Sequence, residues 1–269
     1  MSTAAHITWA PLARSLALEI AGPAARPAYI AIAGAQGSGK TTLARLLTDE
    51  LRQLGVRAVA CSLDDFYLER DRRVVLSQTT HPLLITRGVP GTHDVDLCLR
   101  VLDGVTRVPT SMPQFDKGID DRLDPSRWPL AGPVDVVVIE GWCLGARAQR
   151  AADLATAVNE LERDEDTDGR WRRLVNGALA LRYQALFARF DKLVFLQVPG
   201  IDAVRRWRGE QETGLPQHQR MTAAELQRFI AHYERLTSWM IEDVPGRADL
   251  TVVLDDAHRI ERLITKRFH

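Results

Sequence analysis

Five short, nearly continuous apolar runs recur along the chain, and longer segments of mixed apolar and polar residues separate them. Apolar strands that alternate with helices are typical of a parallel β-sheet covered by helices on both faces. The pattern therefore predicts an α/β fold with five parallel strands flanked by helices. The predicted strands are residues 29–33, 56–63, 134–139, 193–198 and 250–254.

Apolar residues at helical spacing predict three well-marked helices. The first follows the first strand and carries leucines on one face over residues 43–54. The second carries its apolar face over residues 171–187. The third begins with Thr222 and Glu225, which have the spacing of a capping box, and it stops at Pro245.

Residues 68–133 carry no periodic pattern that we can assign, so we expect loops with short helices there. A structureless insertion of that length is uncommon, which favours a substrate-binding role for it. Residues 1–28 are expected to contain one leading helix. The 269 residues suit one large α/β unit, and we expect a single domain over residues 1–269.

Positive and negative charges are balanced, with 35 Lys and Arg residues against 35 Asp and Glu residues. No overall field attracts nucleic acid or an anionic membrane, so neither is an expected partner. The three cysteines are widely spaced and form no CxxC pair, which favours a reducing compartment over a disulfide framework or a zinc site. No run has signal-peptide or transmembrane character, and we expect a cytoplasmic protein of undetermined oligomeric state.

One segment matches the P-loop motif G-x-x-x-x-G-K-[ST] in full and lies between a predicted strand and a predicted helix, as the motif requires. Its glycines let backbone N–H groups wrap a phosphate, and the helix N-terminus adds partial positive charge. The alternative is a glycine-rich turn without a ligand. The expected nucleotide-binding residues are Gly34, Ala35, Gln36, Gly37, Ser38, Gly39, Lys40, Thr41, Thr42 and, from a later helix, Arg205.

Within the motif, Lys40 is expected to reach the β- and γ-phosphates and act in catalysis, and Thr41 to place its hydroxyl on Mg²⁺. Glu140 directly follows the third apolar strand, where a carboxylate usually reaches the metal or its water shell. We therefore expect ATP and Mg²⁺, with Thr41 and Glu140 at the metal. The sequence has neither the Asn-Lys-x-Asp element of GTPases nor the Leu-Ser-Gly-Gly-Gln signature of ABC-type ATPases.

Asp64 and Asp65 follow the second predicted strand. Ligands of open α/β sheets bind beyond the carboxyl ends of the strands, so both carboxylates are expected beside the P-loop. Asp64 is the predicted general base, which accepts a proton from an attacking hydroxyl, and Asp65 is a neighbour that orders metal-bound waters. The alternative is that the pair caps a following helix.

Two loops rich in charge, Gly and Pro occupy residues 87–94 and 113–122 of the insertion. Their cations are candidates to bind an anionic acceptor or triphosphate oxygens, since the fork of an arginine suits a carboxylate. Each of them, taken alone, has the alternative of a solvated surface charge. The expected substrate-binding residues are Asp64, Tyr67, Arg87, His93, Lys117 and Arg122.

Three arginines, Arg205, Arg206 and Arg208, lie on a predicted helix after the fourth strand. In P-loop kinases a mobile lid in this place closes over the triphosphate and supplies cations for the transition state. We expect a lid over about residues 201–220, with Arg208 in catalysis and Arg205 on the nucleotide, although spacing does not decide which arginine points inward. The alternative is a solvated amphipathic helix with Trp207 packed beneath it.

Taken together, these motifs resemble the superfamily of phosphoribulokinase, uridine kinase and pantothenate kinase. The likeness is greatest to its D-glycerate kinase branch and to related predicted bacterial kinases, and it spans roughly residues 28–258. The segments that carry it are residues 34–41, 62–67, 87–94, 115–118, 140–142, 207–212 and 221–237.

The resemblance implies a P-loop NTPase fold with strand order 2-3-1-4-5, a substrate-binding insertion and a lid. It also implies a cytosolic kinase that uses MgATP to phosphorylate a hydroxyl of a small acid, with Asp64 as the base and D-glycerate as the leading acceptor. Residues 158–176 are more similar to the bacterial kinases than to plant glycerate kinases. Two alternatives stay open: a kinase for a nucleoside, a pantothenate-like molecule or a sugar phosphate, and an ATP-binding regulatory or assembly factor.

Overall fold

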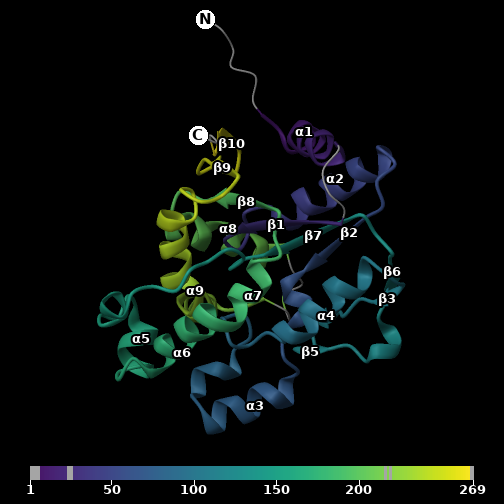
Figure 1. Ribbon diagram of the computed structural model, residues 1–269. Coiled ribbons are helices and arrows are strands. Elements are labelled where there is room, and N and C mark those ends of the chain that lie inside the picture. The colour runs from purple at the N-terminus through teal and green to yellow at the C-terminus, as the bar shows by residue number, and fades with distance from the viewer. Residues whose placement is uncertain (1–6, 23–26, 215–216, 218–219, 267–269) are drawn as a thin grey trace, which may run out of the picture.

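A computed structural model describes residues 7–22, 27–214, 217 and 220–266 (Figure 1). Its central sheet has six strands in the spatial order β2-β7-β1-β8-β9-β10, and each of the five predicted strand segments contributes one of them. The strands are β1 Ala28–Gly34, β2 Ala58–Ser62, β7 Val136–Gly141, β8 Lys192–Gln197, β9 Leu250–Leu254 and β10 Ile260–Thr265.

The last strand is the one that the sequence did not reveal. Strands β2, β7, β1, β8 and β9 are parallel, whereas β10 pairs antiparallel with β9 at the edge of the sheet. Only Ile260 of β10 is buried, so this strand lacks the continuous apolar run that marks the other five. The predicted five-stranded, all-parallel sheet is therefore wrong by one exposed edge strand.

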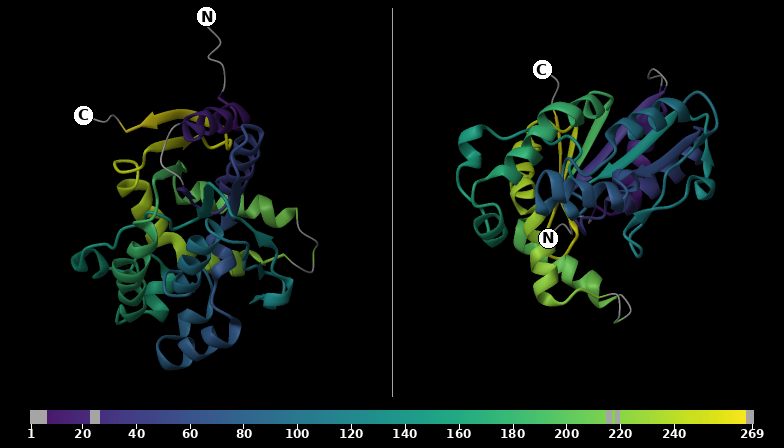
Figure 2. Two further views of the ribbon diagram at one scale, coloured as in Figure 1. Left: turned by 45° about the vertical axis from the view of Figure 1, so that its right-hand side comes forward. Right: turned by 90° about the horizontal axis from the view of Figure 1, so that it is seen from below.

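Alternating side chains of the strands build a hydrophobic core on each face of the sheet, and Figure 2 shows helices covering both faces. In β1, Ile30 and Ile32 lie in one core and Tyr29 and Ala31 in the other, as the two-residue period of a strand requires. The first core is covered by α1 Trp9–Ala21, α2 Lys40–Gln53 and α8 Ile201–Thr213, and the second by α4 Val95–Val105, α7 Gln184–Phe187 and α9 Ala223–Asp243.

The insertion is more ordered than predicted. Helix α4 buries Val95, Cys98, Leu102 and Val105, which repeat at helical spacing, and Asp94 caps its N-terminus by accepting a hydrogen bond from the Leu97 amide. The prediction of an insertion without periodic pattern was wrong there. Its other elements are α3 Arg70–Thr79, the 3₁₀ turns Pro82–Ile85 and Pro125–Arg127, and the short strands β3 Thr110–Ser111, β4 Phe115–Asp116, β5 Asp121–Arg122 and β6 Leu130–Ala131.

The predicted helices after the insertion are present. In α9, the Thr222 hydroxyl accepts the Glu225 amide and the Glu225 carboxylate accepts the Thr222 amide, which confirms the capping box. The helix predicted over residues 171–187 is α6 Arg170–Ala178 and α7, joined by a π-helical turn at Leu179–Tyr183. The remaining elements are α5 Glu160–Glu165 and the 3₁₀ turns Leu63–Phe66 and Ala151–Leu154.

Helix α8 and the first turns of α9 project beyond the sheet, where the lid is predicted (Figure 2). Residues 215, 216, 218 and 219 of the predicted lid lie outside the described residues. Among the helices that the structure describes, none is both long and apolar enough to cross a membrane.

Candidate active site

The P-loop joins the buried strand β1 to helix α2, the context that its motif predicts. Gly37 and Gly39 have φ angles of 80° and 95°, a region that side chains other than glycine rarely adopt. The two glycines therefore give the loop its wrapped shape. Ser38 is fully buried, and its hydroxyl has no hydrogen-bond partner within the described protein.

Two tryptophans from distant helices pack against this loop. A Cβ atom placed on Gly37 would lie 3.3 Å from the Cβ of Trp207 in α8, and one on Gly39 would lie 3.1 Å from the ring of Trp9 in α1. Gln211 of α8 also lies beside Gly37. The loop is thus held from both sides, and no sequence signal revealed the contact with Trp9.

Lys40, Thr41 and Glu140 lie together at the carboxyl ends of β1 and β7. The Lys40 ammonium donates to the Ala35 carbonyl at 2.9 Å, and the Thr41 hydroxyl donates to Glu140 Oε1 at 2.9 Å. Burial lowers the pKa of Lys40, although the charges of Glu140 and Asp64 oppose that shift. The neighbouring carboxylates favour the charged form of this buried ammonium. An anion could therefore bind the Lys40 cation in place of the Ala35 carbonyl.

The residues present suit a magnesium ion. Thr41 and Glu140 supply two oxygen ligands, and the part of the chain that the structure describes has no group of three or more His, Cys, Asp or Glu side chains able to hold a metal. Mg²⁺ in phosphate sites takes one or two protein oxygens and completes its octahedron with phosphates and water. Two neighbouring oxygens beside a P-loop fit that coordination.

Asp64 lies in the 3₁₀ turn after β2, and both of its carboxylate oxygens are engaged. Oδ1 accepts a hydrogen bond of 2.7 Å from the Tyr67 hydroxyl, and Oδ2 accepts one of 2.7 Å from Lys117 Nζ. Burial by itself raises the pKa of Asp64, but the Lys117 ammonium and the Tyr67 hydroxyl outweigh it, and the net pKa is lowered. The Asp64 amide donates to the Ser62 hydroxyl, so Ser62 and not Asp64 caps this turn.

Asp65 has a different environment from its neighbour. Burial raises its pKa to about 6, and the charge of Asp64 adds to that shift, while the Phe115 amide, 3.2 Å from Oδ1, opposes it. The pKa values of the two adjacent carboxyls are therefore shifted in opposite directions, down for Asp64 and up for Asp65.

Tyr67 is held in place by a buried histidine and a second tyrosine. Its ring packs on His93, with centroids 4.8 Å apart, and His93 Nδ1 lies 2.6 Å from the hydroxyl of Tyr183, a residue of the π-helical turn. Burial lowers the pKa of His93 to about 4, so the imidazole is neutral at physiological pH. His93, predicted as a cation for an anionic substrate, is thus an uncharged residue of the wall behind Tyr67.

A two-stranded ribbon carries Lys117 to Asp64. Strands β4 and β5 form the ribbon, and Lys117 lies in its turn with a side chain that is 62% exposed. Arg87 forms an ion pair with Asp120 of the same turn, and its guanidinium lies 5.4 Å from the ring centroid of Phe115. The structure thus brings Arg87 and Lys117 together around one ribbon, although they are 30 residues apart in the sequence.

Arg122 differs from these two cations because it is buried. Its side chain is 6% exposed, it donates to the Tyr67 carbonyl at 2.7 Å, and Glu69 and Asp94 lie within ion-pair distance. Every described contact of Arg122 is thus to the protein itself. The residue fastens the ribbon to the segment that carries Tyr67.

All three arginines of the predicted lid helix form ion pairs with other residues of the protein, Arg206 with Asp256. Arg205 contacts Asp202 at 2.7 Å and Glu234 at 3.1 Å, and Arg208 contacts Glu212 at 2.6 Å. Arg208 is the less exposed of the two, and its guanidinium lies 5.6 Å from the ring centroid of Phe229 in α9. The packing of Trp207 beneath α8, which the sequence offered as the alternative to a lid, is also present.

Two aromatic residues without a predicted role fix the position of Arg87. The Tyr233 hydroxyl donates to the Arg87 carbonyl and the Trp142 indole to the Gly88 carbonyl, both at 2.8 Å, and the two rings meet edge to face. A Cβ on Gly88 would lie only 2.0 Å from the Tyr233 hydroxyl, so the close approach requires glycine. Both aromatics fall in the segments that carry the family resemblance, which is the signal that could have revealed them.

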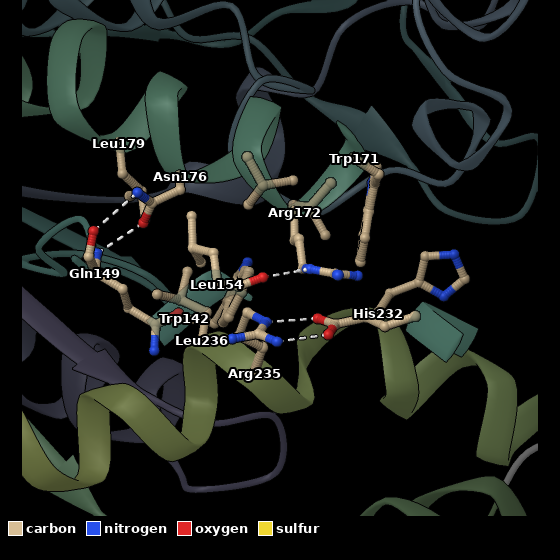
Figure 3. A pocket seen from close by; sticks show the side chains of 13 residues that line it. Trp142, Gln149, Leu154, Trp171, Arg172, Asn176, Leu179, His232, Arg235 and Leu236 are labelled. Atoms are coloured by element: carbon tan, nitrogen blue, oxygen red, sulfur yellow. Dashed lines mark hydrogen bonds and ion pairs between the residues drawn. The ribbon is translucent and has the colours of Figure 1, made fainter. Parts of the chain in front are cut away.

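A small pocket behind these aromatics shows how α9 is anchored (Figure 3). Arg235 of α9 binds both carboxylate oxygens of Glu162 at 2.6 Å, and this pair is almost fully buried. On the opposite wall, Arg172 of α6 donates to the Leu154 carbonyl at 2.7 Å. These bonds tie α5, α6 and the turn at residues 151–154 into the frame that supports Tyr233.

Comparisons with known proteins relate the chain to kinases. A family model described as Zeta toxin matches residues 16–67, which include the P-loop. The uncharacterized kinase mug58 of Schizosaccharomyces pombe is 36% identical over 230 residues, covering 78% of this chain and 80% of the relative.

Two solved structures share the fold over nearly the whole chain. D-glycerate 3-kinase from Cryptococcus neoformans var. grubii is 26% identical, with a TM-score of 0.77 and coverage of 96% of this chain and 97% of that one. The YGR205w protein is 23% identical, with a TM-score of 0.76 and coverage of 98% and 100%. Since a kinase relative shares more than a third of its aligned residues over most of its length, and since the P-loop has its required geometry, the chain belongs to the P-loop kinase family of that relative.

Proposed function

We propose that this protein transfers the γ-phosphate of ATP, with Mg²⁺, to a hydroxyl of D-glycerate. The observation that carries the proposal is the position of Asp64. Its carboxylate, whose pKa is lowered, lies beyond the carboxyl end of β2 and close enough to Lys40 for its charge to raise the pKa of that ammonium. The similarity to a structure whose name is D-glycerate 3-kinase supports the choice of acceptor.

On the donor side, the P-loop amides at the start of α2 bind the phosphates, and Lys40 exchanges its bond to Ala35 for one to the β- and γ-phosphates. Mg²⁺ bound by Thr41 and Glu140 would neutralise charge on the phosphate oxygens. Arg208, in the helix that packs on the P-loop, supplies a further cation. Arg205 is more exposed, and in its present ion pairs it steadies α8 against α9.

On the acceptor side, Asp64 takes the proton of the substrate hydroxyl as the oxygen attacks the γ-phosphorus. The bond from the γ-phosphorus to the bridging oxygen breaks, and ADP leaves with the electron pair. Tyr67 holds Asp64 through Oδ1, so the hydroxyl approaches Oδ2, the oxygen that Lys117 contacts in the absence of substrate. Lys117, in the turn of the ribbon, and Arg87, which pairs with Asp120 of that turn, bind the carboxylate of glycerate.

The test is an ADP-release assay of the purified protein with MgATP and a panel of acceptors: D-glycerate, L-glycerate, uridine, pantothenate and ribulose 5-phosphate. We expect turnover with D-glycerate at least about tenfold above the rest, because only this acceptor matches both the base and the two cations. Activity confined to the last three would contradict the assignment of the acceptor. ATP binding without turnover of any acceptor would favour a regulatory or assembly factor instead.

A further inference from the structure

The contact between Lys117 and Asp64 poses a problem for catalysis. Lys117 Nζ lies 2.7 Å from Oδ2 of Asp64, and the Tyr67 hydroxyl occupies Oδ1 at 2.7 Å. Each oxygen of the base therefore already has a strong donor. An acceptor hydroxyl has to displace one of them before it can give up its proton.

Of the two donors, Lys117 is the one that can leave. Tyr67 is buried and packed between His93 and Phe115, whereas the Lys117 side chain is 62% exposed and has Asp64 as the one polar partner that the described residues provide. A lysine side chain carries its three N–H donors on a flexible four-carbon stem, so its ammonium can move to a new hydrogen-bond acceptor. The mobile group on the base is the ammonium.

The backbone beneath Lys117 is fixed, which keeps the ammonium within reach of the base. Arg73 is almost fully buried, donates to the Asp120 carbonyl at 2.6 Å and contacts Asp120 Oδ2 at 3.0 Å, and Arg87 pairs with the same carboxylate. Arg122 fastens the other strand of the ribbon to Tyr67. The turn is thus pinned on three sides, and the freedom lies in the lysine side chain.

We propose that Lys117 caps the base: without acceptor its ammonium holds Oδ2 of Asp64, and the anionic group of an arriving acceptor draws the ammonium away and frees that oxygen for the hydroxyl. The inference rests on the proposed role of Asp64 as the general base. A water molecule carries no anion to move Lys117, so the cap suppresses hydrolysis of ATP when acceptor is absent.

The cap also defines the class of acceptor. The hydroxyl of the acceptor has to reach Oδ2 of Asp64 while its anionic group binds the Lys117 ammonium. That ammonium stays near Asp64 because the turn of the ribbon is fixed, so the hydroxyl and the anion have to belong to one compact molecule. A short hydroxy acid meets this condition, and a neutral polyol or a nucleoside does not. Lys117 is thus a specificity-determining residue as well as a cap.

The charges around Asp64 predict how its protonation responds when the cap is removed. Burial raises the pKa of Asp64 and the Lys117 ammonium is the largest influence that lowers it, so loss of the ammonium moves the pKa up. A general base works above its pKa, and the acid limb of the rate profile therefore moves to higher pH. The other titratable groups that interact with Asp64 stay in place in both proteins: Lys40, Asp65, Tyr67, His93, Cys143 and Tyr233.

The experiment compares Lys117→Met with Lys117→Arg, which keeps the charge, and with Lys192→Met. Lys192 forms a 2.6 Å ion pair with Glu19 at the amino end of β8, the opposite edge of the sheet from the P-loop. ADP release is measured without acceptor, with D-glycerate and with glycerol, from about pH 3.5 to 9, because the pKa of Asp64 in the wild type is lowered from its ordinary value of 3.8. The double variant Asp64→Asn/Lys117→Met shows whether any gain depends on the base.

We expect Lys117→Met to raise acceptor-free hydrolysis at least about fivefold, to raise the KM for D-glycerate about 10- to 100-fold through loss of a charge-assisted bond, and to raise the kcat/KM for glycerol, which cannot displace the cap of the wild type. The acid limb of Lys117→Met moves up in pH, Lys117→Arg keeps hydrolysis suppressed and the limb in place because it keeps the charge, Lys192→Met stays close to the wild type, and the double variant loses the hydrolysis. Unchanged acceptor-free hydrolysis together with an unmoved acid limb overturns the cap, even if D-glycerate is the acceptor. If D-glycerate is inactive but hydrolysis rises and the limb moves, the cap stands and the proposed acceptor fails.

Discussion

The P-loop takes its shape from eight consecutive residues, whereas the side chains around Asp64 come from segments spread between residues 62 and 235. In the loop, Gly37 and Gly39 provide the backbone angles, and the amides that bind phosphate come with the turn itself. Around Asp64, each group depends on another: Tyr67 on His93, Lys117 on its ribbon, and Arg87 on Tyr233 and Trp142.

The P-loop and the surroundings of Asp64 should therefore respond to mutation in different ways. A change in the loop acts on one ligand through the local backbone. A change in the acceptor half acts through packing, so a residue that touches no substrate still moves the site. The four changes below test this contrast, beginning with the largest expected effect.

Asp64→Asn is expected to lower kcat by about 10²- to 10⁴-fold, because an amide cannot accept the proton of the acceptor. The affinity for ATP is expected to stay within about threefold, since the P-loop is untouched. Steady-state turnover and calorimetric titration of nucleotide measure the two effects. Turnover that survived the change would remove Asp64 from the role of base, and equal losses in both measurements would mean that the two halves are not separable.

Arg235→Met is expected to lower the free energy of unfolding by about 3–5 kcal/mol, because it leaves the carboxylate of Glu162 buried without its partner. The KM for the acceptor should rise as α9 loses its anchor near Tyr233, while nucleotide affinity changes little. Denaturant unfolding and acceptor kinetics provide the measurements.

The matched control is Arg228→Met, which removes an exposed ion pair between the same two helices, α9 and α5. Its expected cost is below about 1 kcal/mol. Similar losses for the two variants would show that the buried pair has no special part in holding the acceptor half.

Asp65→Asn is expected to change how stability depends on pH. Burial raises the pKa of Asp65 from 3.8 to about 6, so between these values the folded protein holds a proton that the unfolded chain has lost. As pH rises through that window, this group therefore costs the wild type about 3 kcal/mol of stability, of which about 2 kcal/mol falls between pH 4.5 and pH 7, and the variant lacks this loss. Urea unfolding of both proteins at pH 4.5 and pH 7 measures the difference, and parallel curves would refute the assignment.

Gly37→Ala has the smallest expected effect on stability, about 1 kcal/mol, from forcing a side chain into a left-handed conformation. Nucleotide affinity should fall about fivefold or more, while the acceptor KM stays unchanged. Gly55→Ala is the control, because Gly55 has a φ of 78° and nothing within 4 Å of the added carbon. The prediction fails if both variants weaken nucleotide binding equally.

Much of the fold follows from residues that are close in the sequence. The continuous apolar runs reveal five of the six strands, since a strand buried on both faces has no polar positions. Strand β10 could not be predicted from an apolar run because five of its six residues are exposed. Helix α4 was predictable from its buried spacing but was missed within a segment rich in loops.

The site divides in the same manner. The P-loop, Asp64 and Glu140 could be located from their order after apolar strands, because parallel strands bring their carboxyl ends to one edge of the sheet. The charge of a loop residue gives no information on its burial, and the same motif-based reasoning gave Lys117, His93 and Arg122 one role. In the structure they are an exposed ammonium bonded to Asp64, a neutral imidazole, and a guanidinium with a largely buried side chain that holds the Tyr67 carbonyl.

The sequence by itself determined that a phosphate-binding loop joins a strand to a helix, because glycine conformations and backbone amides are local properties. The surroundings of Asp64, by contrast, depend on how distant segments pack together. The contact of Lys117 with that carboxylate, and the support of Arg87 by Tyr233 and Trp142, join residues 53 to 146 positions apart. Burial and charge at such contacts depend on how the segments pack, and no local pattern in the chain encodes them.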